Sequence, residues 1–542
     1  MTKGYAAYYI LLTLGIYIIG AAGIDLMDND ATQYSTIAMQ MKDSGNYLEP
    51  VWRDWEYLDK PPLLFWLSSW FFSLFGTGHF AYRLPSILVN LLGIYSTYKL
   101  GKKLYNEQTG LIAAVIFATT FANFVVNHDV RTDTMLTGFT VFSLWQLLEY
   151  LDNKRISHFI WTFIGIGLSM LTKGPIGIMV PILAAGPYLI FRKRWKDLFR
   201  PEWLLGLLII AIVLSPMVIG LYRQHGWTGI EFYFWNQSFG RLTGENYWVD
   251  NSGPFFFVHS FLWSFLPWTL LALVAYIKKW IVLIGKKEQN PEILCLSGIT
   301  LVFIGMSMSS YKLPHYIYVV FPLVAILTGA FIEQSFRSVK WEGFGKPLTV
   351  GQIVLNILLW FAIILTFLIF PGAAWYLYLV EWFILGYFIY TLTIKDLTIP
   401  VIFRSSLVTI LGVAFILNTH FYPSLCDYQA GPIVGRELKK MDIDPADFLV
   451  YKAHRPSLDF YAERILPRSE DITSFDSIVG TNHTRVVFTR AQFLPDLTNE
   501  GYRFDTIRRY EDFHISQLTL PFLNPASRDE AVRICYLLSL KN

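Results

Sequence analysis

The chain has 542 residues, of which 54% are hydrophobic and only 16% are charged. An average soluble domain carries about 25% charged residues. This composition and a mean hydropathy of +0.41 therefore exclude an ordinary soluble protein and indicate a membrane protein. The net charge of +3 is too small to suggest nucleic acid as a partner. Cys295, Cys426 and Cys535 lack the paired spacing of zinc or redox motifs.

The first apolar run covers residues 5–26 and follows Lys3. It is longer than the roughly 7–15 residues of a signal-peptide core, so we interpret it as a retained membrane span. A bilayer requires about 20 apolar residues per helix. Twelve further runs meet or approach this length, for about thirteen spans in total: 80–100, 109–127, 133–150, 157–172, 175–191, 203–222, 254–277, 292–308, 313–332, 350–370, 373–394 and 402–420. The shorter run 62–75 follows Pro61-Pro62 and predicts an interfacial helix.

Basic residues predict the orientation of these spans. With the N-terminus inside, alternate loops collect most of the Lys and Arg residues, and such loops are normally cytoplasmic. An odd number of spans then leaves the C-terminus outside. The basic residues are Lys99, Lys102, Lys103, Lys154, Arg155, Arg192, Lys193, Arg194, Lys196, Arg200, Lys278, Lys279, Lys286, Lys287, Arg337, Lys340, Lys346 and Lys395.

The composition changes after about Tyr422, which divides a transmembrane part, 1–422, from a soluble part, 423–542. Short apolar runs at 448–451 and 485–488 predict strands, and 456–463 predicts a helix. We therefore expect a small α/β domain on the outer face. Cys426 and Cys535 both fall in it, so a disulfide between them is one hypothesis for an oxidising compartment.

Two polar clusters fall in the first outer loop, 27–79. Asp30 and Tyr34 follow the first span, where a carboxylate could take a proton from an acceptor hydroxyl or orient a sugar. Asp30 could equally cap the stretch that follows it. Tyr57, Asp59 and Lys60 precede the Pro pair, which places a cation at a helix entrance where it could hold a lipid phosphate. The alternative for Lys60 is a lysine that merely reaches toward the interface.

Two shorter outer segments carry further charges. Arg131 and Asp133 stand between the third and fourth spans, where Asp133 could join Asp30 in a carboxylate pair or simply cap its helix. Lys173 lies in the tight turn Leu171-Thr172-Lys173-Gly174-Pro175. For this lysine, a connecting turn is at least as good an explanation as substrate contact.

The last polar cluster enters the tenth span. Lys312, His315 and Tyr316 lie three and four residues apart, so one helical turn would bring a cation, an imidazole and a phenol together around a phosphate. Arg241, in the aromatic-rich outer loop 223–253, could join them. Interfacial aromatic belts explain the aromatic residues of that loop equally well.

The order of these motifs resembles the bacterial C-type glycosyltransferases, a family of dolichyl-phosphate-mannose-protein mannosyltransferase-like proteins that includes the aminoarabinose (lipid A) transferases. The motifs are Asp-x-x-x-Tyr, Leu-Asp-Lys-Pro-Pro, Arg-x-Asp, Leu-Thr-Lys-Gly-Pro and Lys-Leu-Pro-His-Tyr, and the resemblance covers about residues 5–420. It implies the fold of that family, a catalytic Asp30, a second outer aspartate at Asp133 and a carrier phosphate held by Lys60. Gln33 stands where the aminoarabinose transferases have an arginine, Asp59 stands where they have a glutamate, and 236–241 lacks a histidine. These departures argue against carrying over their metal site and their lipid A acceptor to this chain.

These features predict a transferase in the bacterial inner membrane. A sugar would pass, with inversion, from undecaprenyl phosphate to a glycolipid resembling lipid A, a protein hydroxyl or a glycan on the periplasmic face. Asp30 would act as base or orient the nucleophile, while Lys60, Lys312 and His315 would stabilise the departing phosphate. No cofactor is expected to be required, and a divalent metal is left open. The alternatives are a ligase or oligosaccharyl transferase that uses a lipid-linked oligosaccharide, and a flippase or transporter, which would place more charges at the bilayer midplane.

Overall fold

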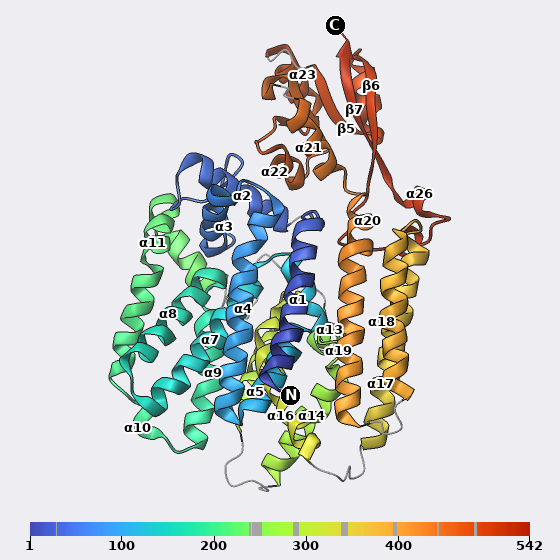
Figure 1. The fold of residues 1–542 in the computed structure, drawn as a ribbon. Helices are drawn as coiled ribbons and strands as arrows, with labels where there is room; N and C mark the ends of the chain where they lie inside the picture. The colour runs from blue at the N-terminus through green and yellow to red at the C-terminus, as the bar shows by residue number, and fades with distance from the viewer. Residues whose placement is uncertain are drawn as a thin grey trace.

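The computed structural model describes residues 1–28, 30–237, 240, 252–285, 292–337, 345–393, 398–441, 444–481 and 485–541. A bundle of helices fills most of the molecule, and a small domain built on a β-sheet stands at one end of it (Figure 1). The N-terminus lies at the opposite end of the bundle from this domain. The chain therefore begins and ends on opposite sides of the helical layer.

The helices of the bundle follow the predicted apolar runs. Each run overlaps one helix or two consecutive helices of the structure. In the first half these are α1 (Lys3–Gly23), α4 (His79–Leu104), α5 (Glu107–Ala118), α6 (Phe121–His128), α7 (Thr132–Asn153), α8 (Ile156–Lys173), α9 (Ile176–Phe191) and α11 (Glu202–Glu231), with the short α10 (Trp195–Leu198) between the last two. In the second half they are α13 (Phe256–Ser264), α14 (Thr269–Ile284), α15 (Leu294–Ser307), η2 (Pro314–Val320), α16 (Phe321–Arg337), α17 (Gly345–Ile369), α18 (Trp375–Thr393) and α19 (Ile399–Ile416), which continues through η3 (Leu417–Phe421) into α20 (Tyr422–Cys426).

The chain is a multi-pass helical membrane protein. Within the described residues, six helical segments are long and apolar enough to cross a bilayer, or seven if α5 and α6, bent by 52°, form one span. The prediction of thirteen spans stays a prediction. Figure 1 places α10, which lies within the basic stretch at 192–200, at the same end of the bundle as the N-terminus. Lys286, Lys287, Lys340 and Lys395 lie outside the described residues.

Glycines allow the central helices to approach one another closely, as is common between membrane helices. A Cβ atom added at Gly93 of α4 would lie 3.0 Å from the Cα of Gly138 in α7. One added at Gly138 would lie only 2.5 Å from the carbonyl oxygen of Val89. Side chains at these positions would force α4 and α7 apart, and α7 begins at the site described below.

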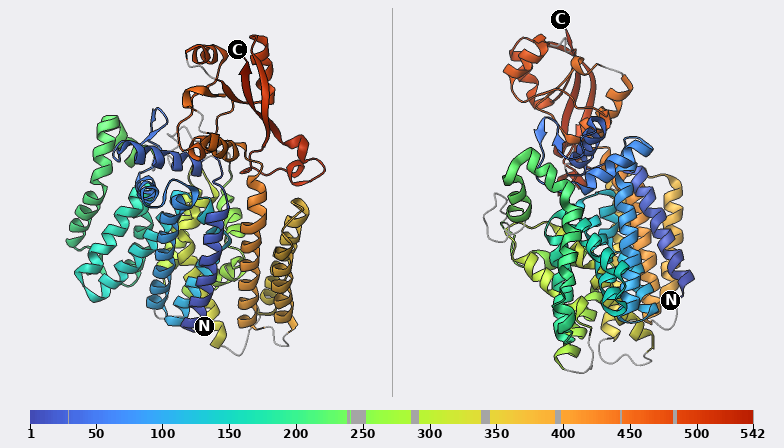
Figure 2. Two further views of the ribbon diagram at one scale, coloured as in Figure 1. Left: turned by 45° about the horizontal axis from the view of Figure 1, so that its top comes forward. Right: turned by 90° about the vertical axis from the view of Figure 1, so that its left-hand side faces the viewer.

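The first outer loop folds into two helices and a small hairpin. Helix α2 (Asp30–Ser44) is followed by β1 (Val51–Trp52), which pairs antiparallel with β2 (Trp55–Glu56), and then by α3 (Leu63–Phe75). Helices α2 and α3 lie at the end of the bundle nearest the sheet domain (Figure 2). Helix α3 is the predicted helix at 62–75, and its exposed Trp70, Leu74 and Phe75 suit an interfacial position.

The C-terminal domain has the predicted α/β character. Its five-stranded sheet has the order β4-β3-β5-β7-β6, in which β3 pairs parallel with β4 and β5, and β7 pairs antiparallel with β5 and β6. The strands are β3 (Phe448–Tyr451), β4 (Arg468–Ser469), β5 (Val486–Arg490), β6 (Arg503–Asp512) and β7 (Arg533–Lys541). The helices are α21 (Ala430–Met441), α22 (Pro456–Ala462), α23 (Ile472–Thr481), α24 (Leu494–Asn499), α25 (Leu520–Leu523) and α26 (Arg528–Ala531), with 3₁₀ turns η4 (Pro445–Asp447) and η5 (Ala491–Phe493).

The proposed disulfide is wrong. Cys426 and Cys535 are both free and buried. Cys426 ends α20 and packs with Phe370 and Phe522 at the top of the bundle, whereas Cys535 lies on β7 in the core between the sheet and α21. The two thiols therefore belong to different hydrophobic clusters.

Candidate active site

A polar cavity of about 170 Å³ lies where several bundle helices meet the loop 27–79. Elements far apart in the sequence contribute to it: the start of α2, the loop before α3, the start of α7, the end of α8 and η2. The cavity is lined by Asp30, Tyr34, Asp59, Lys60, Arg131, Thr132, Asp133, Lys173, Tyr311, Leu313, His315 and Tyr316. Most of the predicted site residues thus converge in one place.

Asp30 is the first residue of α2, and its carboxylate faces the cavity. It forms an ion pair of 2.6 Å with Arg131, which also contacts Asp129 at 3.1 Å. Burial alone would lower the pKa of Arg131, but the carboxylates of Asp129 and Asp30 raise it above its usual value. The guanidinium therefore stays charged and fixes the Asp30 carboxylate, which is still 40% exposed and accessible to a ligand.

Tyr34 lies one turn further along α2 and lines the same cavity. Its ring is buried against Phe65, and burial raises the pKa of its phenol well above the usual value. Tyr34 is therefore a neutral hydroxyl at the cavity wall.

Asp133 is the most deeply buried carboxylate of the cavity, with 3% of its side chain exposed. It lies in the first turn of α7 and forms an ion pair with Lys173 at the end of α8. His315 Nε2 lies 3.6 Å from the other oxygen of Asp133. The Lys173 ammonium also stands 4.0 Å from the centre of the Tyr316 ring, a cation–π contact. No side chain caps α7, so Asp133 joins three elements instead of serving as a cap.

Lys60 stands on the opposite side of the cavity, in the loop before α3. Its ammonium contacts the Asp59 carboxylate at 2.6 Å, and the Gln237 side chain donates to the other oxygen of Asp59 at 2.7 Å. Because Asp59 is itself 40% exposed, it neutralises Lys60 only partly. The cation remains available to an anionic ligand.

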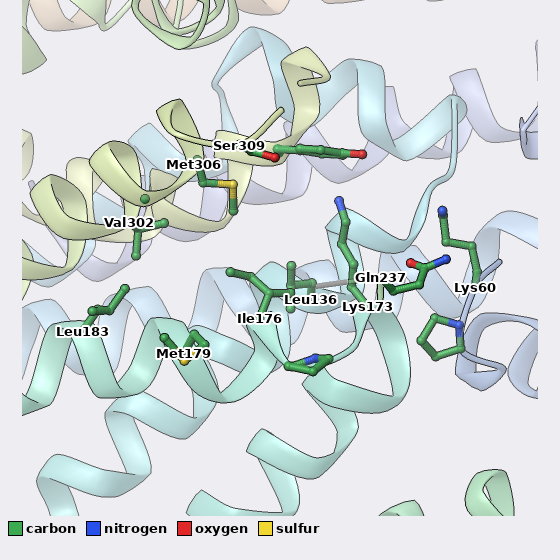
Figure 3. Close-up of a pocket in the computed structure, with 14 residues that line it drawn as sticks. Lys60, Leu136, Lys173, Ile176, Met179, Leu183, Gln237, Val302, Met306 and Ser309 are labelled. Carbon is green, nitrogen blue, oxygen red and sulfur yellow. The ribbon is translucent and has the colours of Figure 1, made fainter. Parts of the chain in front are cut away.

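An apolar cavity of about 190 Å³ adjoins the polar one and shares Lys60, Lys173 and Tyr316 with it. Figure 3 shows Lys60, Lys173 and Gln237 at one end of this cavity and apolar side chains at the other. The apolar wall is formed by Leu136, Ile176, Met179, Leu183, Val302 and Met306, from α7, α9 and α15. The two lysines therefore mark the junction between an apolar channel within the bundle and a polar chamber beside the loop 27–79.

Three predicted residues are not part of this arrangement. Lys312 precedes η2 and donates to the carbonyl of Ser252 at 3.0 Å, so the expectation that it shares one helical face with His315 and Tyr316 is wrong. The buried ring of Tyr57 packs against Phe65 behind the polar cavity. Arg241 lies outside the described residues.

The structure adds Lys173 and Gln237 to the site. The Thr-Lys-Gly-Pro turn contained a signal for Lys173, but sequence alone could not distinguish a snorkelling lysine from a partner of Asp133. Nothing in the sequence pointed to Gln237. Among the described residues, no three His, Cys, Asp or Glu side chains converge in a group that could hold a metal ion.

Solved structures share the fold of this protein. Its fold is that of the C-type glycosyltransferases. It superposes on the crystal structure of ArnT from Cupriavidus metallidurans bound to undecaprenyl phosphate with a TM-score of 0.74, covering 99% of this chain and 98% of that one at 17% identity. It also matches the apo oligosaccharyltransferase of Archaeoglobus fulgidus with a TM-score of 0.52, covering 91% and 70% of the two chains at 13% identity. At these identities the likeness establishes the fold alone.

Sequence comparisons show which proteins this chain resembles. Residues 59–219 match the model of the dolichyl-phosphate-mannose-protein mannosyltransferase family, a range that includes Lys60, Asp133 and Lys173. The undecaprenyl phosphate-alpha-4-amino-4-deoxy-L-arabinose arabinosyl transferase of Pseudomonas aeruginosa (strain LESB58) is 26% identical over 64% of this chain and 63% of its own length. The enzyme of the same name from Edwardsiella ictaluri is 26% identical over 61% and 60%. The matched region spans less than two thirds of the length of these relatives. The predicted resemblance to this family is confirmed.

Proposed function

We propose that this protein is a glycosyltransferase that moves a sugar from a polyprenyl phosphate, with undecaprenyl phosphate the preferred carrier, to an acceptor on the outer face of a bacterial inner membrane. The observation that carries this proposal is the junction of the two cavities. A polyprenyl chain is apolar and its phosphate is a dianion, so the carrier suits an apolar channel that ends at two lysines. The similar arabinosyl transferases, named for undecaprenyl phosphate, and the ArnT structure bound to undecaprenyl phosphate support the same donor.

The reaction would proceed in the polar chamber. With the carrier phosphate between Lys60 and Lys173, the sugar would extend toward Asp30. The acceptor oxygen would attack the anomeric carbon from the face opposite the phosphate, the bond from that carbon to the phosphate oxygen would break, and the configuration would invert. Asp30 would accept the proton of an acceptor hydroxyl. The phosphate would leave with the bonding electrons, and the two ammonium groups would stabilise its growing charge.

Asp133 and His315 would organise this site. One oxygen of the Asp133 carboxylate pairs with the Lys173 ammonium, and His315 Nε2 lies near the other oxygen. Because the lysines supply positive charge, we propose that a divalent metal is not required. The N-terminus would be cytoplasmic and the sheet domain periplasmic, as the positive-inside rule indicates. The acceptor would be a glycolipid resembling lipid A, a protein hydroxyl or a glycan.

The direct test uses purified protein in detergent and undecaprenyl phosphate as the probe. The wild type should bind this lipid, and Lys60→Met and Lys173→Met should each weaken binding at least about tenfold, the loss expected for a charge-assisted contact. Lys42→Met, on the same loop but bonded to Thr77 away from both cavities, is the matched control and should bind normally. Equal binding by all four proteins would refute the proposed donor site. Transfer from a purified polyprenyl-phosphate sugar, with and without EDTA, then tests the chemistry and the metal.

A further inference from the structure

A glutamine at the end of α11 reaches the cavity junction. Helix α11 continues into the π-helix η1 (Phe232–Asn236), and Gln237 follows directly, with its backbone N–H bonded to the Phe232 carbonyl at 2.9 Å. Turns of π-helix are rare and occur frequently at functional sites. The Gln237 side chain lines the apolar cavity together with Lys60 and Lys173. Figure 3 shows it between these two lysines.

The η1 turn is anchored to the helix that carries Lys173. Tyr233 is buried, and its hydroxyl donates to the Met170 carbonyl of α8 at 2.8 Å. Met170 lies about one helical turn before Lys173. The end of α11 is therefore held against the Lys173 end of α8, and from there Gln237 reaches across to the loop that carries Lys60.

The Gln237 amide binds Asp59 at two points. Its nitrogen donates to the carboxylate Oδ1 at 2.7 Å and to the Asp59 backbone carbonyl at 2.5 Å. Both partners are acceptors, so the amide must keep its nitrogen toward Asp59. The other carboxylate oxygen, Oδ2, contacts the Lys60 ammonium at 2.6 Å. Asp59 thus lies between a neutral hydrogen-bond donor and the cation that would hold the carrier phosphate.

We propose that Gln237 is a positioning residue that sets the affinity of the site for the carrier phosphate, acting through Asp59 on Lys60. The proposal rests on the proposed function and deepens it. When a phosphate dianion binds, the Lys60 ammonium turns toward it and Asp59 loses part of its partner. The two hydrogen bonds from Gln237 keep the carboxylate bonded and in place, which limits its competition for the ammonium.

The energetic consequence follows from the charge on Asp59. Without the Gln237 amide, Asp59 depends more on Lys60, so the carboxylate competes harder with the phosphate for the same ammonium. A hydrogen bond to a charged group is strong enough for the resulting loss of affinity to reach about tenfold. If Asp59 itself is uncharged, no carboxylate has to be restrained. The same change at Gln237 should then cost little.

The test is a double-mutant cycle that measures undecaprenyl phosphate binding by the purified protein in detergent. Gln237→Leu should weaken binding about tenfold in the wild type but at most about twofold in Asp59→Asn protein. Gln237→Glu places an acceptor against the Asp59 carboxylate and should bind more weakly than Gln237→Leu. Adding Asp59→Asn to Gln237→Glu exchanges the amide and the carboxylate, which restores a hydrogen-bonded pair and should recover most of the affinity.

The matched control is Gln224→Leu. Gln224 also lies on α11 and donates to the carbonyl of Pro50 in the same loop at 3.0 Å, but it is not among the residues that line the two cavities. This variant should bind undecaprenyl phosphate normally. A loss equal to that of Gln237→Leu would show that any tether between α11 and the loop has this effect, and would overturn the proposal. If Gln237→Leu lowers the thermal unfolding midpoint, Gln237→Glu with and without Asp59→Asn decides the question.

Turnover supplies a second measurement that a purely structural role would not reproduce. With a polyprenyl-phosphate sugar as substrate, Gln237→Leu should raise KM and leave kcat within about twofold, because the carrier phosphate is held in the ground state and the transition state alike. A lower kcat with an unchanged KM would overturn the proposal. Failure of the wild type to bind undecaprenyl phosphate would refute the proposed function and this inference with it. Binding by the wild type, with no loss in Gln237→Leu or the same loss in both backgrounds, would refute only this inference.

Discussion

Replacing Lys60 or Lys173, the two lysines at the cavity junction, with methionine should have very different effects on the stability of the protein. Lys173→Met and Lys60→Met both remove an ammonium group that would hold the donor phosphate. They differ in the carboxylate that each leaves behind. Asp133, the partner of Lys173, has 3% of its side chain exposed, whereas Asp59, the partner of Lys60, has 40% exposed. We therefore expect similar losses of donor binding but unequal losses of stability.

The size of the difference follows from burial. Removing one partner of a buried ion pair leaves an uncompensated charge and costs about 3–5 kcal/mol. An exposed pair contributes only about 0–1 kcal/mol, because water and salt screen it. Lys173→Met should thus destabilise the protein by several kcal/mol more than Lys60→Met. Adding Asp133→Asn to Lys173→Met removes the stranded charge and should restore most of the stability but no activity.

The assay compares thermal unfolding midpoints of the purified variants in one detergent, without donor lipid, together with undecaprenyl phosphate binding. Lys60→Met should unfold within a degree or two of wild type, and Lys173→Met clearly below both. Equal midpoints for the two single variants would show that Asp133 does not depend on Lys173 for its charge. A double variant that is less stable than Lys173→Met would refute the reasoning in the same way.

Three more predictions concern Asp30 as the proposed base, the Lys60 cation and the orientation of the chain in the membrane. Asp30→Asn should lower the transfer rate about 100- to 10,000-fold with folding intact, because the amide keeps the shape but loses the basicity; a rate within about twofold of wild type would make Asp133 the leading catalytic candidate. Lys60→Arg should retain part of the donor affinity that Lys60→Ala loses, since the charge persists, and unchanged affinity in Lys60→Ala would return Lys60 to an interfacial role. A phosphatase fused after Asn542 should be active, whereas activity of a cytoplasm-only reporter there would overturn the orientation.

Much of the fold could be predicted from the sequence because the length of an apolar run indicates the kind of element that it forms. Long apolar runs identified the helices of the bundle, and short apolar runs identified β3 and β5 in the C-terminal domain. The stretch 456–463 identified α22. Whether an aspartate at a helix start caps the helix was harder to predict. Asp30 and Asp133 both stand at helix starts, where an aspartate often caps. Yet Asp30 forms an ion pair with Arg131, just before α7, and Asp133 forms one with Lys173 at the end of α8. Helix boundaries alone do not distinguish these roles.

The sequence indicated most of the residues that line the cavity but not which of them contact one another. Motifs located Asp30, Lys60, Asp133 and His315 on one face, and the cavity brings them together. The prediction that Lys312 shares a helical face with His315 and Tyr316 was wrong because it assumed a regular helical turn, whereas η2 begins only at Pro314. The partnership of Lys173 with Asp133 depends on how α7 and α8 pack. No spacing in a single sequence reveals that packing.

The sheet domain is part of the site's framework, because it fixes the loop that carries Lys60. Arg53 lies in that loop with a left-handed backbone, φ 60°, and its guanidinium inserts into the domain. There it pairs with the fully buried Asp459, contacts His454 at 2.9 Å and donates to the Leu466 carbonyl at 2.5 Å. Bundle helices can fix Asp133 and Lys173 by their own packing, but a loop of this length needs external support. The domain supplies that support at Asp28, where the loop begins, and again at Arg53, seven residues before Lys60. The part of the loop that carries Asp30, Asp59 and Lys60 is thus held in place against the helix ends that complete the cavity.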